Sequence, residues 1–168
     1  MNYVPMKKIS IVLFLCCSAL FSQETEKREI SKTLDAWHAA AGSADFENYF
    51  GLMTQDAVFI GTDASENWNR RAFMEYAKPH FDKGKAWNFT SVERHIFIDA
   101  AAEFAWFDEL LDTQMKICRG SGVLKKEDGK WKIAHYVLSI AVPNEHVTEL
   151  IQLKKAKDDL LLEQLKMK

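Results

Sequence analysis

Several features that mark specialised proteins are scarce in this sequence. Two of its three cysteines, Cys16 and Cys17, lie in an apolar N-terminal stretch, so Cys118 has no partner for a disulfide in the rest of the chain. The net charge is −2, which does not provide the basic field that nucleic-acid binding requires. The sequence also contains no repeat and no low-complexity tract. A domain of this size must therefore be held together by its hydrophobic core.

The apolar N-terminal stretch has the layout of a secretory signal peptide. Two lysines precede an apolar run over residues 9–21, which is too short to span a membrane, and polar residues follow it. We predict that residues 1–23 are a signal peptide and that the chain is exported, to the periplasm or to the medium. A lipoprotein is disfavoured, because Leu15 and Cys16, which precede the two leader cysteines, are not the small residues that a lipidation site prefers.

The clearest local signal is a β-hairpin in the last third of the chain. Asp128-Gly129 separates two alternating segments, residues 118–127 and 130–139, and this dipeptide in that setting is the strongest short-range hairpin signal. Strict alternation places several residues of each strand on one face of that strand. These residues are Arg119, Ser121 and Val123, then Trp131, Ile133, His135, Val137 and Ser139. A face that mixes bulky apolar residues with Arg, Ser and His predicts the wall of a small-molecule pocket.

Helical periodicity appears in four other places. Apolar residues at helical spacing predict a first helix over residues 26–41, and Ser43 is positioned to cap a short second helix. A third helix is expected to begin near Asn69. Past Pro143, residues 145–168 predict a C-terminal helix outside the main domain, which covers residues 24–144.

The remaining segments are predicted to be strands. Residues 57–60 form one short strand, and residues 88–98 and 103–113 form two long strands before the hairpin. Three helices followed by a long antiparallel sheet indicate an α+β domain. Its sheet must curve around the helices to bury one face.

The order of these pieces resembles the nuclear transport factor 2-like superfamily, and within it the SnoaL-like branch. The resemblance is carried by Trp37, the Asp45-Phe46 helix start, residues 56–59 and the hairpin at residues 128–133, and it covers residues 30–144. It implies a cone-shaped fold in which a curved antiparallel sheet wraps around three N-terminal helices, with a pocket at the open end. The superfamily contains isomerases, cyclases, dehydratases, hydrolases and binding modules, so the resemblance does not choose a function.

Comparison with ketosteroid isomerase, a superfamily member of known mechanism, argues against that reaction. Trp37 corresponds to its oxyanion-binding tyrosine, Gly61 to its general-base aspartate, and a position near Ser121 to its protonated aspartate. All three catalytic groups are therefore missing. The SnoaL-like cyclases use a pocket aspartate and histidine, for which this chain offers candidates without a matched motif.

Asp108 is the first such candidate. Alternation groups it with Phe104, Trp106 and Leu110, and if this face points inward its pKa rises unless a cation such as Arg119 pairs with it. His135, on the strand beyond, would then serve as an acid or base near neutral pH. We predict a cavity with a polar floor of Asp108, Arg119 and His135 and with apolar walls of Trp37, Phe59 and Trp106. The structural alternative is an ion pair that closes the cone beside a hydrogen-bonded core histidine.

The loop over residues 61–68 is the second candidate, because the resemblance places it at the mouth of the pocket. Asp63 is positioned to supply the base that Gly61 lacks, and Trp68 to cover a ligand. The alternative is that Asp63 forms an Asx turn and Trp68 anchors the loop to the core. The histidines show no paired metal spacing, so neither a metal nor another cofactor is expected.

These observations predict an exported domain that binds a small apolar or amphipathic molecule without catalysis. The alternative is a cofactor-free lyase, isomerase or hydrolase that uses Asp108 and His135 as an acid–base pair. No nucleic acid and no membrane span are expected. A homodimer is expected to cover the apolar outer face of the sheet. By alternation this face carries Phe107, Tyr136, Leu138 and Ile140.

Overall fold

The computed structural model describes the backbone of residues 6–167 and the side chains of residues 23–167. Its helices and strands follow in the order predicted from the sequence, with one short additional strand, β2. They are α1 (Met6–Gly42), α2 (Phe46–Gly51), β1 (Met53–Ile60), β2 (Asn67–Asn69), α3 (Arg70–Asp82), β3 (Phe89–Ile98), β4 (Phe104–Thr113), β5 (Lys116–Glu127), β6 (Lys130–Ile140), a 3₁₀ turn η1 (Asn144–His146) and α4 (Val147–Lys166).

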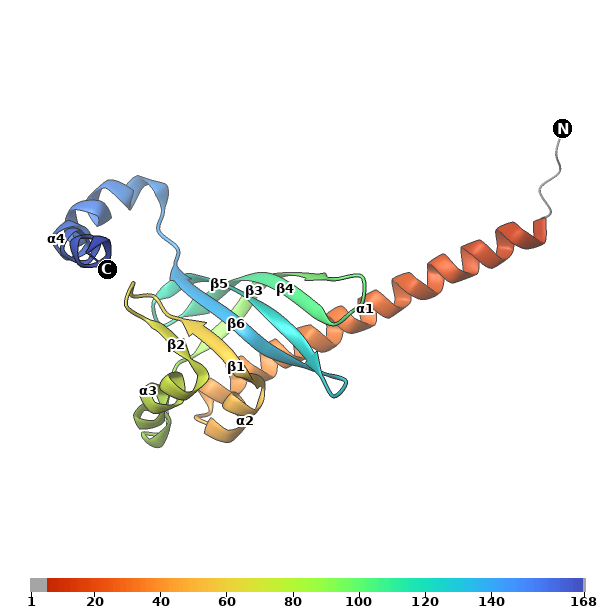
Figure 1. The fold of residues 1–168 in the computed structure, drawn as a ribbon, viewed down its shortest axis with the longest axis horizontal. Helices are drawn as coiled ribbons and strands as arrows, with labels where there is room; N and C mark the ends of the chain where they lie inside the picture. The colour runs from red at the N-terminus through yellow and green to blue at the C-terminus, as the bar shows by residue number, and fades with distance from the viewer. Residues whose placement is uncertain (1–5, 168) are drawn as a thin grey trace.

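The strands form one six-stranded sheet in the order β2-β1-β6-β5-β4-β3. Neighbouring strands run antiparallel, except that β1 pairs with β6 in parallel. Helices α1, α2 and α3 lie on one side of the curved sheet, and α4 lies beyond the end of the sheet, after the linker that follows β6 (Figure 1). The predicted α+β architecture, a curved sheet wrapped around N-terminal helices with an added C-terminal helix, is confirmed.

The helix ends differ from the prediction at two points. Helix α1 begins at Met6 rather than near residue 26, so its backbone continues through the predicted leader. Asp45, and not Ser43, caps α2, because its carboxylate accepts a hydrogen bond from the backbone N–H of Asn48 at 3.1 Å. The Ser43 hydroxyl instead donates to the carbonyl of Ala39 at 2.9 Å.

The inner face of the sheet packs on α1, and the faces of β4 are opposite to the prediction. The buried side chains of β4 are the odd-numbered ones, including Phe107, Glu109 and Leu111. The residues predicted to point inward therefore face outward. They are Phe104, Trp106, Asp108 and Leu110.

A bulge in β6 changes which residues of that strand face inward. Ile133 lies opposite Leu124, whereas His135 lies opposite Val123, so Ala134 is the extra residue that resets the alternation. The predicted single face of this strand is therefore wrong from His135 onward. The buried residues of β6 are Trp131, Ile133, Tyr136 and Leu138.

The observed orientations of β4 and β6 also overturn the predicted dimer face. Phe107, Tyr136 and Leu138 were assigned to the outer face, but all three are buried in the core. Ile140 is 48% exposed and is the member of that set that lies outside. Any interface on the outer face must be built from other residues.

Two glycines of β5 lie where neighbouring core atoms leave no space for a side chain. A Cβ atom on Gly120 would lie 2.2 Å from the hydroxyl oxygen of Tyr136, and one on Gly122 would lie 2.3 Å from the backbone oxygen of His135 and 2.9 Å from the ring of Phe107. Tyr136 is fully buried and contacts the Trp37 ring at a centroid distance of 4.8 Å. The absence of side chains at both positions is therefore a packing requirement.

Glu26 ties α1 to the hairpin of β5 and β6. Its carboxylate accepts hydrogen bonds from Lys126 Nζ and from the Trp131 indole Nε1, each at 2.7 Å. The hydrogen bond from Lys126 lowers the pKa of Glu26, against a smaller opposing effect of burial. The folded domain therefore includes α1 from at least this residue.

Candidate functional site

A small aromatic cavity lies at the end of the sheet where β1 ends and β4 turns into β5. Its volume is about 160 Å³. Residues from α3, four strands and three loops converge on it. The aromatic ones are Phe59, Trp68, Phe73, Tyr76, Trp87 and Phe89. We refer to this cavity as the aromatic pocket.

The rings of the aromatic pocket are packed on one another. Phe59 stacks on Phe73 at a centroid distance of 4.0 Å, and Trp68 stacks on Tyr76 at 4.6 Å. Stacked rings with few free rotamers hold their positions well. The pocket is therefore a preformed slot suited to a flat apolar group.

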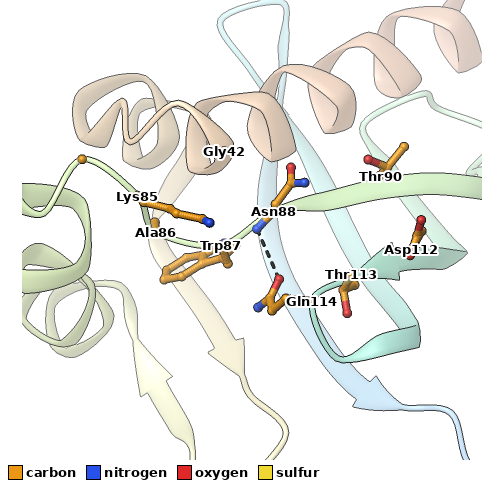
Figure 2. Close-up of a pocket in the computed structure, with 10 residues that line it drawn as sticks. Gly42, Lys85, Ala86, Trp87, Asn88, Thr90, Asp112, Thr113 and Gln114 are labelled. Carbon is orange, nitrogen blue, oxygen red and sulfur yellow. Dashed lines mark hydrogen bonds between the residues drawn. The ribbon is translucent and has the colours of Figure 1, made fainter.

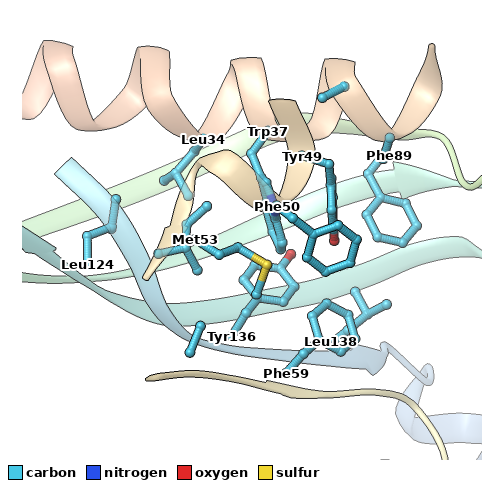
Figure 3. Packing of buried hydrophobic residues seen from close by; sticks show 14 of the residues in the cluster. Leu34, Trp37, Tyr49, Phe50, Met53, Phe59, Phe89, Leu124, Tyr136 and Leu138 are labelled. Atoms are coloured by element: carbon cyan, nitrogen blue, oxygen red, sulfur yellow. The ribbon is translucent and has the colours of Figure 1, made fainter. Parts of the chain in front are cut away.

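Two buried donors without acceptors lie behind these rings. The Tyr49 hydroxyl and the Trp37 indole Nε1 have no hydrogen-bond acceptor within the described part of the chain, although the Trp87 indole lies close enough to the Tyr49 oxygen to lower its pKa slightly against the effect of burial. Figure 3 shows the Tyr49 hydroxyl directed toward the side of the core where Phe59 and Leu138 lie, and both of these line the pocket. Burial raises the pKa of Tyr49 well above its usual value, so the hydroxyl keeps its proton and can only be satisfied by an acceptor.

A charged cluster is buried deeper, between α1 and the sheet. Glu109 is 1% exposed, and its Oε1 accepts from His38 Nε2 at 2.8 Å and from the Tyr136 hydroxyl at 3.1 Å. Its Oε2 faces Nε and Nη2 of Arg94 at 2.9 and 2.8 Å. Arg94 also reaches Asp35 on α1, at 2.7 Å.

The partners of Glu109 decide its protonation. Burial would raise the pKa of this carboxyl, but His38 and Arg94 together outweigh burial and hold the pKa below its ordinary value of 4.5. Both oxygens are occupied by protein donors, so no lone pair is left for a proton from a ligand. The cluster is therefore built to close the fold rather than to act as a base.

Glu66 is the carboxylate that lines the aromatic pocket itself, at its mouth. Its Oε2 accepts a hydrogen bond from the backbone N–H of Asp63 at 3.1 Å. Gly61 leaves the space for this side chain, because a Cβ there would lie 2.1 Å from the same oxygen. Comparison with ketosteroid isomerase places the general base at the position of Gly61. Because Gly61 has no side chain, the carboxylate of Glu66 occupies that space instead.

The loop residues predicted as functional have separate roles. Asp63 Oδ1 accepts from the backbone N–H of Ser65 at 2.9 Å, which is the Asx turn given as the structural alternative, and Ser65 lowers the pKa of Asp63. Asp63 does not line the aromatic pocket. Trp68 both anchors the loop on Phe73 and forms one wall of the pocket. Phe59 also lines the pocket, as predicted.

The predicted polar floor lies on the outer face of the sheet, and its inward orientation is wrong. Asp108 is opposite Ser121, and Trp106 is opposite Val123, which is opposite His135. These residues share one face with each other, but it is the face away from α1. Trp106 is 50% exposed there. The predicted residues on this outer face are Trp106, Asp108, Arg119, Ser121 and His135.

Asp108 pairs with a histidine other than the expected one. His95 Nδ1 lies 3.0 Å from Asp108 Oδ1, and His95 Nε2 lies 3.3 Å from Glu93. The hydrogen bond with Asp108 raises the pKa of His95. This exposed pair lies on the opposite face of the sheet from the interior cluster of Glu109.

A second, larger hollow adjoins the aromatic pocket (Figure 2). This polar cleft has a volume of about 790 Å³ and is lined by Lys85, Asn88, Thr90 and Asp112, among others. It shares Trp87 and Gln114 with the aromatic pocket. The backbone N–H of Asn88 donates to the Gln114 side chain at 3.3 Å, across the cleft. Trp87 is thus the wall between an apolar and a polar space.

Two absences concern only residues 6–167, the part of the chain that the structure describes. No group of three His, Cys, Asp or Glu side chains among them is arranged to hold a metal ion. In the same part of the chain, no helix combines the length and hydrophobicity needed to cross a membrane.

With this geometry in place, comparison with known proteins identifies the family. The model of the SnoaL-like domain matches residues 30–143, which is more than half of the chain. The chain belongs to the SnoaL-like family. No curated protein matches it significantly.

Solved structures similar to this SnoaL-like domain have low sequence identity. An NTF2-like protein of unknown function from Pseudomonas putida is 16% identical, with a TM-score of 0.57 over 70% of this chain and 88% of that one. A candidate dehydratase of the NTF2-like family from Streptomyces avermitilis is 12% identical, with a TM-score of 0.62 over 72% and 99%. The association domain of CaMKII from C. elegans is 19% identical, with a TM-score of 0.59 over 70% and 98%. At these identities the likeness shows the fold alone.

Sequence reasoning did not find Tyr49, Glu66 or Glu109 as site residues. Glu109 alternates with the apolar Phe107 and Leu111, and that spacing was the available signal for an inward carboxylate. Tyr49 and Glu66 carried no such signal, because their positions depend on how α2 and the β1–β2 loop pack.

Proposed function

We propose that this SnoaL-like domain binds a small, flat, mostly apolar molecule that carries one hydrogen-bond acceptor. The observation that supports it most is the aromatic pocket itself, and behind its lining residues the buried Tyr49 hydroxyl, which is not part of the lining, has no acceptor. A buried donor without an acceptor costs about 1–3 kcal/mol, which an incoming carbonyl or ether oxygen would recover. A cavity of 160 Å³ is about the size that accepts a single benzene ring.

We further propose that the domain binds without catalysis. The buried carboxylate that could have served as a base, Glu109, is fully engaged by His38, Tyr136 and Arg94. Asp108 and His135 do not face the pocket, so the acid–base pair expected from the sequence has no access to a ligand there.

A catalytic alternative rests on Glu66, since this carboxylate lines the pocket mouth. A Glu66→Gln variant separates the two functions. If the domain is an enzyme, this variant binds ligand but no longer converts it. If the domain only binds, neither the wild type nor the variant converts any bound compound.

The binding proposal is tested with acetophenone and ethylbenzene, which match in shape but differ in one carbonyl oxygen. Thermal unfolding of the purified chain is measured with each compound, alongside a Tyr49→Phe variant. Because this variant removes an unsatisfied buried hydroxyl, we expect it to be at least as stable as the wild type. Acetophenone should stabilise the wild type more than ethylbenzene does, and Tyr49→Phe should abolish the difference.

Two results would contradict the binding proposal. One is that neither compound, nor any other single-ring ketone or ether, changes the unfolding temperature. The other is that Tyr49→Phe leaves the preference for the carbonyl compound intact.

Export of the chain remains part of the proposal. It is supported by the two lysines and the apolar run before the domain. N-terminal sequencing of chain recovered from the periplasm or the medium should show removal of the segment up to about residue 23. An unprocessed chain retained in the cytoplasm would contradict export.

A further inference from the structure

The aromatic pocket has a negative charge at its mouth that no cation of the described chain neutralises. Among the described residues that line it, Glu66 carries the charge, and none is Lys, Arg or His. The Oε2 atom of Glu66 accepts a hydrogen bond from the backbone N–H of Asp63 at 3.1 Å. Within residues 23–167 its Oε1 atom has no hydrogen-bond donor, and the carboxylate belongs to no ion pair. One carboxylate oxygen is therefore available to a ligand.

Two lysines of α4 lie near this carboxylate, but they have other acidic neighbours. Lys154 and Lys157 line a crevice of about 580 Å³ whose lining also includes Glu66. Lys154 pairs with Asp158 of its own helix at 3.0 Å. The hydrogen bonds of its turn lower the pKa of Asp63 most, and the charge of Lys157 lowers it further. Neither lysine is thus the counter-ion of Glu66.

The aromatic rings of the pocket favour the same sign of ligand charge as Glu66 does. The face of an aromatic ring is the negative part of its quadrupole, and it attracts a cation that lies within about 6 Å of the ring centre. Tryptophan is the strongest ring in this respect, and both Trp68 and Trp87 line the pocket. Tyr76, stacked on Trp68 at 4.6 Å, adds a third electron-rich ring. Rings and carboxylate together provide a site for an organic cation.

The structural role of Glu66 in its loop does not require a charge. A glutamine at this position would accept the same hydrogen bond from the backbone N–H of Asp63 through its amide oxygen. Glu66 is partly buried, and a charged group that leaves water without a counter-ion is costly. The loop alone therefore does not explain why a carboxylate, rather than an amide, lies at the mouth of the pocket.

We propose that the ligand of the aromatic pocket is an organic cation, in which a flat ring enters the pocket and an ammonium group lies at the mouth against Glu66. This inference rests on the binding function proposed above and adds the charge of the ligand to it. The acceptor oxygen that Tyr49 would bind belongs to the inner end of such a molecule, and the ammonium group to its outer end. Aromatic amines and quaternary ammonium compounds belong to this class, whereas aromatic carboxylic acids do not.

The sizes of the two adjoining hollows agree with this division of the ligand. The aromatic pocket, at about 160 Å³, is filled by one ring. A substituent on that ring must therefore extend through the mouth. Gly61, Thr62 and Glu66 line both the aromatic pocket and the crevice of about 580 Å³, so the space beyond the mouth begins at the carboxylate. An ammonium group on a short substituent reaches this position.

The test compares phenyltrimethylammonium with tert-butylbenzene, which have nearly the same shape and differ in the positive charge. Dissociation constants for the purified full chain are measured by quenching of tryptophan fluorescence, because Trp68 and Trp87 line the pocket. The wild type should bind the cation about tenfold more tightly than the hydrocarbon, as cation–π attraction and the carboxylate act together. Acetophenone is measured in the same series as the probe of the binding function itself.

Three variants show which groups recognise the charge. Glu66→Gln keeps the shape of the side chain and its hydrogen bond, and it should remove most of the preference for the cation. Asp63→Asn is the matched control, since it removes a carboxylate of the same loop that does not line the pocket, and asparagine also forms an Asx turn. This control should keep the preference. Tyr76→Leu, at a 45% exposed position, should weaken binding of the cation more than that of the hydrocarbon.

Equal affinity of the wild type for the two compounds would overturn the cation assignment. So would a preference that Glu66→Gln leaves intact, or one that Asp63→Asn removes as fully. Tighter binding of benzoate than of phenyltrimethylammonium would also overturn it, because the lysines of α4 would then set the charge of the ligand. If acetophenone binds and the cation is not preferred, the charge assignment fails while the binding function stands. If none of these compounds binds, both proposals fail.

Discussion

Gly120→Ala offers the sharpest check on how the interior is packed. The added methyl group would lie 2.2 Å from the Tyr136 hydroxyl oxygen and 3.1 Å from Cγ of Glu109. Tyr136 cannot retreat easily, because it is fully buried and its ring contacts Trp37 at a centroid distance of 4.8 Å. The substitution should therefore push the Tyr136 hydroxyl away from Glu109, which it now reaches at 3.1 Å.

The expected loss has two sources. Overpacking a core by one methyl group costs about 1–3 kcal/mol, and a lost hydrogen bond to a charged group costs about 1.5–3 kcal/mol. Because the two overlap, we expect Gly120→Ala to lower the free energy of unfolding by about 3 kcal/mol. For a domain of this length that corresponds to a fall of roughly 10 °C in the unfolding temperature.

Gly51→Ala is the matched control. A Cβ at this position, the last residue of α2, meets nothing within 4 Å. The control should be neutral or stabilising by up to about 1 kcal/mol, as alanine is favoured over glycine in a helix. Urea unfolding followed by tryptophan fluorescence measures both variants. Equal stability of Gly120→Ala and Gly51→Ala would refute the argument that Gly120 exists to admit Tyr136.

Three other predictions concern charged groups. Glu109→Gln should destabilise the domain by about 3 kcal/mol in urea unfolding, because it removes the buried carboxylate that pairs with Arg94 and leaves the exposed Asp35 as the remaining counter-charge; a loss under 1 kcal/mol would contradict this. The pKa of Glu109 is lower in the folded state than its ordinary value of 4.5, so the stability that this carboxylate contributes is present above pH 4.5 and is lost as the pH falls below that value. Below pH 4.5 the free energy of unfolding of the wild type should therefore fall more steeply than that of Glu109→Gln. Glu26→Gln should cost about 1–2 kcal/mol, since it weakens the contact with Lys126. Its control Glu24→Gln, at an exposed ion pair, should cost nearly nothing, and equal losses would contradict the role of Glu26 as a tie.

The sequence predicted the strands and their order because turn chemistry and periodicity are local signals. The Asp128-Gly129 hairpin forms as expected, with both residues at positive φ. The inward face of β4 was not predictable in the same way, since both of its faces carry large apolar residues. The buried face is the one from which Glu109 contacts Arg94 of β3 and His38 of α1, and these contacts cannot be read from the sequence of β4 alone.

The candidate site was misplaced for a related reason. Alternation was carried through β6 without a break, whereas the bulge at Ala134 turns His135 outward. A bulge depends on the partner strand and leaves little trace in one sequence. Of the predicted pocket residues, Phe59 and Trp68 line the aromatic pocket, whereas Trp37, predicted as a wall, is buried in the core and does not line it.

The parallel pairing of β1 with β6 has a consequence for how the domain is made. Within residues 6–167, every other strand pair joins neighbours along the chain, but this pair joins Met53–Ile60 to Lys130–Ile140. Until the last strand has been synthesised, the β1–β2 ribbon and the β3–β5 meander remain two separate sheets. Loop closure over so much chain is slow, so the nascent protein should stay open and dependent on chaperones until late in synthesis.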